Sequence, residues 1–217
     1  MSNESGVSMS QANQAAAAQQ TFEYATRADH PRRPFRALVV AVFCIAAAWF
    51  IGVTTNAISA LISAQYYDVV LGGFGRFAFG RRLSFAEVVQ QGLFESSCVG
   101  IGFAVIFTLV YVAATATRCP LPIVVRALGL AVLVALGFWV VGGLAGLAWG
   151  YFDPASFRGS FIVPVQSTPD ELRRWAFVGG SIWGVYAGSV LSVIVASVTL
   201  HVRWRNLLLA SCSITDL

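Results

Sequence analysis

The 217-residue sequence contains no lysine and few charged residues of any kind. Charged residues make up 11% of the chain and hydrophobic residues 57%, whereas a soluble domain carries about 25% charged residues. A water-soluble fold would therefore have too little polar surface. We attribute the missing lysine to codon bias, because a specific use for guanidinium groups would not remove every lysine. The net charge of +4 is spread along the chain and forms no basic stripe of the kind that nucleic acid needs.

Motifs for metals, cofactors and catalysis are also missing. The four cysteines are widely separated, there is no CxxC, and the two histidines are not at metal-ligand spacing. The sequence has no HExxH, no phosphate-binding glycine loop and no GxSxG. His201 is at the opposite end of its apolar segment from the other polar groups, and no aspartate lies deep in an apolar segment. We expect no catalytic site, no metal and no cofactor, and a lipid bilayer rather than nucleic acid as partner.

Long apolar stretches dominate what is present. Four of them run from about residue 37 to 63, 88 to 114, 127 to 150 and 176 to 202. As helices they would each be roughly 36 to 40 Å long, enough to cross a bilayer core of about 30 Å. Backbone polar groups cannot bond to water inside a bilayer, so such stretches must be helical. The sequence predicts an all-α integral membrane protein with four transmembrane helices.

The charged and polar segments divide the chain into two hairpins with tails. We expect a flexible polar tail at residues 1–26, a first hairpin at 27–118, a second hairpin at 119–205 and a short tail at 206–217. With four spans both termini share one side, which holds eight of the fourteen arginines, four of them just before the first span. By the positive-inside rule this side is the cytoplasm. The predicted location is a bacterial inner membrane.

The two hairpins show an internal repeat. Tyr66-Tyr67-Asp68 ends the first predicted span, and Tyr151-Phe152-Asp153 ends the third. Parallel repeats of this kind are a common way to build membrane proteins. Between each signature and the next span lie about fifteen residues, for which we expect a short interfacial helix or turn with Asp68 and Asp153 as N-caps.

A capping box follows each interfacial segment. In this motif a hydroxyl accepts from the backbone N–H three residues on, and a glutamate reaches back to the N–H of the cap residue. The first pair is Ser84 and Glu87, and the second is Thr168 and Glu171, with a proline next to Thr168. Both pairs predict the start of a helix that leads into the membrane.

Small residues recur at every fourth position in the spans. Such stripes let a neighbouring backbone approach closely. The stripe positions are Gly92, Ser96 and Gly100 in the second span, Gly142 and Gly146 in the third, and Gly180, Gly184 and Gly188 in the fourth. We expect them to be helix-packing surfaces.

Glu95 is the one ionisable side chain well inside a predicted span, and such residues are functional candidates by default. Asn56 lies at a similar depth in the same hairpin, with Thr55 and Ser96 near that level. A protonated Glu95 bonded to Asn56 would be a structural clasp, which we favour over a near-surface glutamate or a transport role. The second hairpin has Trp183 where Glu95 would fall, which argues against a symmetric transport path.

Three functions remain open from sequence alone. The favoured one is a non-enzymatic helical bundle that self-associates or packs with a membrane partner through the small-residue stripes. The second is a small-solute, ion or proton transporter that operates as an oligomer around Glu95. A membrane-embedded enzyme is the least favoured, because no catalytic constellation is present.

Overall fold

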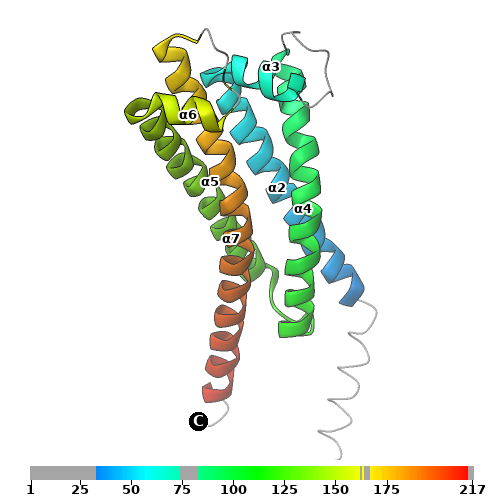
Figure 1. The fold of residues 1–217 in the computed structure, drawn as a ribbon. Coiled ribbons are helices and arrows are strands. Elements are labelled where there is room, and N and C mark those ends of the chain that lie inside the picture. The colour runs from blue at the N-terminus through cyan, green and yellow to red at the C-terminus, as the bar shows by residue number, and fades with distance from the viewer. Residues whose placement is uncertain (1–32, 74–82, 162, 164–166, 215–217) are drawn as a thin grey trace, which may run out of the picture.

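A computed structural model of the chain describes residues 33–73, 83–161, 163 and 167–214, so the predicted polar tail at 1–26 lies outside the described residues. The described residues form six helices and no strand (Figure 1). The helices are α2 (Arg33–Ile62), α3 (Ala64–Gly73), α4 (Phe85–Thr115), α5 (Leu121–Phe152), α6 (Pro154–Ser160) and α7 (Pro169–Ile214).

Four of these helices, α2, α4, α5 and α7, are long and apolar enough to cross a membrane. The prediction of an all-helical chain with four span-length helices is therefore confirmed. α2 starts before its predicted apolar range, and α4, α5 and α7 extend beyond both ends of theirs. The extension is longest for α7, which has 46 residues and continues past Arg203 and Arg205. Hydropathy marks only the apolar part of a helix, and no glycine or proline follows Gly188 to break α7.

The long helices are packed as two pairs. α2 packs mainly along α4, and α5 packs mainly along α7, whereas contacts between the two pairs are sparse. The short helices α3 and α6 lie at one end of the bundle, and the start of α2 and the end of α7 lie at the other (Figure 1). We call these the outer and inner ends, after the predicted sides of the membrane.

Each end has its own apolar core. The outer core packs Tyr66 and Tyr67 of α3 against Phe157 and Trp175. The inner core gathers side chains of all four long helices, among them Val40, Phe107, Val124 and Leu200.

Both predicted capping boxes are present. Ser84 Oγ accepts from Glu87 N at 3.3 Å, and Glu87 Oε2 accepts from Ser84 N at 2.8 Å. The same two bonds join Thr168 and Glu171, at 3.3 Å and 2.8 Å. The first capping box caps the N-terminus of α4. The second caps the N-terminus of α7, where Pro169 is the first helical residue.

The two outer segments differ in a way that the sequence repeat did not predict. α5 ends at Phe152, and Asp153 is the N-cap of α6, where its carboxylate accepts from Ser156 N at 3.0 Å. α2 instead ends at Ile62, and α3 begins at Ala64. Asp68 therefore lies inside α3.

The expectation of an N-cap at Asp68 is wrong. The Asp68 carboxylate accepts from the backbone N–H of Leu83 at 2.7 Å. This bond connects α3 to the residue that precedes the N-cap of α4. The aromatic residues of the two signatures also lie in different environments. Tyr67 is 3% exposed and Phe152 is 81% exposed. The break at Ser63 places the first signature in α3, where its two tyrosines are buried, while the second remains at an exposed helix end.

Candidate functional site

A cleft between the two helix pairs is the candidate site. Its lining comes from residues 44–56 of α2, 92–103 of α4, 128–132 of α5 and 182–192 of α7, and it holds about 70 Å³ of space for the centres of water-sized molecules. One water needs roughly 10 to 15 Å³ of such space. The cleft therefore has room for several waters or for a small polar group, and we call it the inter-hairpin cleft.

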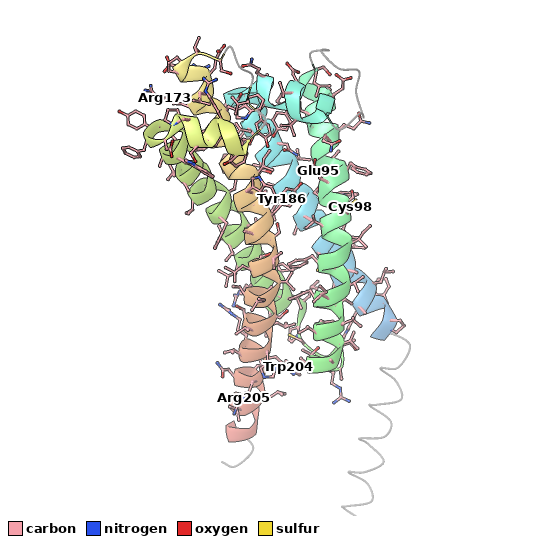
Figure 2. The ribbon with its side chains drawn as sticks, in the orientation of Figure 1. Glu95, Cys98, Arg173, Tyr186, Trp204 and Arg205 are labelled. Carbon is pink, nitrogen blue, oxygen red and sulfur yellow. The ribbon has the colours of Figure 1, made fainter. Side chains whose placement is uncertain are left out.

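Among the described residues that line the cleft, Glu95 of α4 contributes the only carboxylate, and none is an arginine or histidine. Its Oε1 accepts from Gln91 Nε2 at 2.7 Å, one turn earlier on the same helix. Its Oε2 accepts from the hydroxyl of Tyr186 at 3.1 Å. Tyr186 belongs to α7, so this second bond joins the two helix pairs across the cleft (Figure 2).

Asn56 lines the same cleft but bonds a different partner from the one expected. Its Oδ1 accepts from the hydroxyl of Tyr67 at 2.7 Å, and its Nδ2 lies against Gly92. Asn56 and Glu95 were predicted to lie at a similar depth in the membrane, and both line the cleft. The clasp between them is not formed, because Asn56 faces α3 and α4 while the Glu95 carboxylate faces α7.

The hydroxyl groups of the cleft donate to their own helices. Thr55 Oγ1 donates to Ile51 O at 2.8 Å, and Ser96 Oγ donates to Gly92 O at 2.6 Å. Ser189 of α7 does the same towards Val185 O at 2.7 Å. A hydroxyl whose proton is used in this way still has lone pairs. The cleft therefore presents mainly hydrogen-bond acceptors to anything inside it.

The small-residue stripes lie inside the hairpins. On the first pair, a Cβ added at Gly92 would meet Gly52 and Asn56, and one added at Gly100 would meet Ala48 at 2.7 Å. On the second pair, the residues that approach each other are Gly142, Gly146, Ala176, Gly180 and Gly184, with Gly188 against Phe138 at 2.6 Å. The stripes are thus used for packing within the chain, not left open for a partner.

Sequence reasoning missed Tyr186. The repeat aligned Trp183 with Glu95, but Trp183 points outward and is exposed, and Tyr186 faces the carboxylate instead. One signal was available. A tyrosine deep in an apolar span, away from the interfacial belt, carries a hydroxyl that needs a partner.

The two apolar cores flank the cleft. At the outer end the Tyr66 ring packs on Trp175 with centroids 5.0 Å apart. Burial, together with the Glu95 carboxylate, raises the pKa of Tyr66 to about 12. At the inner end the Tyr111 hydroxyl donates to Thr117 O at 3.2 Å, in the short connection between α4 and α5. An apolar core therefore lies towards each end of the cleft.

A second cavity of about 470 Å³ lies at the outer end of the second hairpin, formed by α5, α6 and α7. Tyr151, Arg158 and Arg173 are among its lining residues. Arg173 donates to Asp170 at 3.1 Å, and its guanidinium lies 5.0 Å from the centre of the Tyr151 ring. Arg158 donates to Ser167 O at 3.0 Å. Both cations therefore already have partners within the chain.

In the part of the chain that the structure describes, no three His, Cys, Asp or Glu side chains are grouped so that they could hold a metal ion. The sequence matches no protein-family model, and comparison with curated proteins and with solved structures gave no match. The inter-hairpin cleft is therefore the feature of the molecule that bears most directly on function.

Proposed function

We propose that the chain is inserted in a bacterial cytoplasmic membrane as a four-span protein with both termini in the cytoplasm, its hairpins forming a parallel repeat. The outward faces of the long helices support insertion. Leu61, Leu133 and Val190 are each about two-thirds exposed or more. Apolar surface in water costs roughly 25 cal/mol per Å², and monomeric soluble proteins rarely expose large patches of it.

Within that setting we propose that the chain is a non-enzymatic transporter that moves protons, alone or in exchange for a small solute or ion, with the inter-hairpin cleft as its binding site. The observation that carries this proposal is the Glu95 carboxylate inside the cleft, bonded to Tyr186 of the other hairpin at 3.1 Å. Ionisable groups within spans are costly and mark solute or proton paths. Binding sites between repeats near the middle of the bilayer are a recurring arrangement.

The packing supports a transporter over the self-associating bundle that the sequence favoured. That hypothesis used the small-residue stripes as contact surfaces, and they are occupied within each hairpin. Tight packing within the pairs and sparse contact between them would let the hairpins move as two bodies around the cleft.

Transport is tested with purified protein in vesicles that contain a pH-sensitive dye, under an imposed membrane potential. We expect proton flux in the wild type and its loss in Glu95→Gln, which keeps the shape and removes the titratable group. Asp170→Asn is the matched control, because Asp170 is an exposed acid at the outer end. Equal flux in Glu95→Gln and wild type, or no flux in folded wild type, would contradict the proposal.

Insertion and orientation are tested by single cysteines in a background without native thiols. Ser156→Cys in α6 and Arg205→Cys near the end of α7 are both at exposed positions. We expect a membrane-impermeant maleimide to label Ser156→Cys in intact spheroplasts and Arg205→Cys only after lysis. The reverse pattern would overturn the orientation. Labelling of both before lysis would overturn the even number of spans, and labelling of neither before lysis would overturn insertion.

A further inference from the structure

We infer that the inter-hairpin cleft takes a lipophilic monovalent organic cation, of the alkylammonium class, which enters from the bilayer between α4 and α7. This inference rests on the proposed function and names the substrate class of the same site. It draws on the charge of the lining, the chemistry of the walls and the direction in which the cleft is open.

The charge of the lining selects a cation with a single charge. Glu95 is its only carboxylate, no basic side chain is present, and the hydroxyls of Thr55, Ser96 and Ser189 already donate to backbone carbonyls. An anion would meet a carboxylate and acceptor oxygens. A divalent metal ion prefers six or more oxygen ligands with several carboxylates among them. One positive charge balances the site.

The walls select an organic cation. Most of the lining surface is apolar, contributed by Ile51, Val99, Leu128, Val132 and Val185 among others. A hydrated inorganic ion would lose water without regaining enough ligands there. An alkylammonium head can donate to Glu95 while its methylene groups are buried against these side chains. The rings of Phe103 and Tyr186 also line the cleft and can face a cation.

The direction of access selects a molecule that dissolves in the bilayer. The apolar cores at both ends of the bundle separate the cleft from the outer and inner ends. Its side is less covered: Tyr186 is 38% exposed although its hydroxyl bonds Glu95, and Val99 is exposed to the same extent. In a bilayer that exposed side faces lipid. A ligand with an apolar tail reaches Glu95 by this route, and the tail can remain in the side opening.

The size of the cleft limits the head group. An engineered apolar cavity of about 150 Å³ accepts benzene, and the inter-hairpin cleft holds about 70 Å³. A primary ammonium or a singly methylated ammonium head is small enough, whereas a bulky aromatic cation is not. The predicted ligand therefore has a narrow cationic head and an alkyl tail.

The test uses three probes with the same tail and different heads: hexylammonium, hexanol and hexanoate. Binding is measured by calorimetry with the full chain in nanodiscs of zwitterionic lipid, and empty nanodiscs supply the partitioning background. We expect saturable binding of hexylammonium, at least 10-fold weaker in Glu95→Gln and unchanged in Asp170→Asn. Tyr186→Phe should weaken binding less than Glu95→Gln, because it removes a carboxylate partner and keeps the ring.

Three results would overturn the inference. The first is binding of hexanol or hexanoate as tight as that of hexylammonium, and the second is equal hexylammonium binding by Glu95→Gln and wild type. The third is methylammonium binding as tight as hexylammonium binding, which would remove the role of the apolar tail. Glu95-dependent proton flux without hexylammonium binding would refute the substrate class and leave the transporter proposal standing. Loss of both would refute both.

Discussion

The hydroxyl of Tyr67 and the side-chain oxygen of Asn56 lie 2.7 Å apart, and their hydrogen bond ties α3 to α2 at the outer end of the inter-hairpin cleft. Tyr67 is buried, and burial raises its pKa well above the usual value. The hydroxyl therefore keeps its proton and acts as the donor at any physiological pH. This bond holds α3 against α2, next to the outer core.

Replacement of Tyr67 by Phe should destabilise the fold by about 1 to 2 kcal/mol, because a buried amide oxygen loses its donor. The measurement is the free energy of unfolding in a detergent titration that follows helix content. Tyr66→Phe is the control, since it keeps the ring contact with Trp175. A loss of stability in Tyr67→Phe no larger than that in Tyr66→Phe would mean that the hydrogen bond to Asn56 does not hold α3.

Two glycines of α5 offer a matched test of helix approach. A Cβ at Gly142 would meet the carbonyl oxygen of Gly180 and the Cα of Gly184, whereas one at Gly137 would meet nothing within 4 Å. We expect Gly142→Ala to destabilise the fold by about 1 to 3 kcal/mol through overpacking. Gly137→Ala should be neutral or stabilising by up to about 1 kcal/mol, from helix propensity alone. The measurement is thermal unfolding of the two variants under the same conditions. Equal stability of the two would mean that α5 and α7 are farther apart than the structure shows.

The thiol of Cys119 should react slowly with alkylating reagents. Burial raises its pKa to about 11, against about 8.5 for a free thiol. The thiolate is the reactive form, so at pH 8 its fraction should be lower by roughly two orders of magnitude. The labelling rate of a variant that keeps only Cys119 should rise steadily with pH up to about 11. Labelling of the folded protein as fast as that of the SDS-unfolded protein would show that the connection between α4 and α5 is open.

Ala116 ends α4 in the left-handed region, with φ of 47°. A Cβ costs about 1 to 2 kcal/mol in this conformation, and glycine avoids the cost. Ala116→Gly should therefore stabilise the fold by about 1 kcal/mol. Ala113→Gly, inside the regular part of α4, should instead destabilise it by about 0.5 to 1 kcal/mol. Unfolding free energies of both variants give the comparison, and destabilisation of both would mean that residue 116 is helical in the membrane.

Local sequence signals predicted the helices and their starts well. Hydropathy gave the four long helices because each apolar run has to satisfy its own backbone hydrogen bonds. The capping boxes at Ser84 and Thr168 were predictable because both partners are within four residues. The end of α2 near Ser63 agrees with the predicted end of the first span, but the start of a new helix at Ala64 was not predicted. No glycine or proline marks it, and it depends on the burial of Tyr66 and Tyr67 against α7.

The sequence predicted the depth of the candidate site in the membrane, but it did not predict the hydrogen-bond partners of Glu95 and Asn56. Counting residues from the span ends placed Glu95 and Asn56 at one level, and both line the cleft. The direction in which each side chain points depends on how the helices are rotated about their axes. That rotation is set by the glycine contacts within each pair, which are interactions across the sequence. Tyr186 faces Glu95 for this reason, although the two are 91 residues apart.

α7 continues far beyond the inter-hairpin cleft towards the inner end of the bundle. At 1.5 Å per residue its 46 residues extend for about 69 Å, and the 28 residues beyond Tyr186 extend for about 42 Å. A tilt of about 5° at Tyr186 would move the inner end of this rod by roughly 4 Å. A small tilt of α7 at Tyr186 would thus appear at its inner end as a displacement on the scale of a side chain.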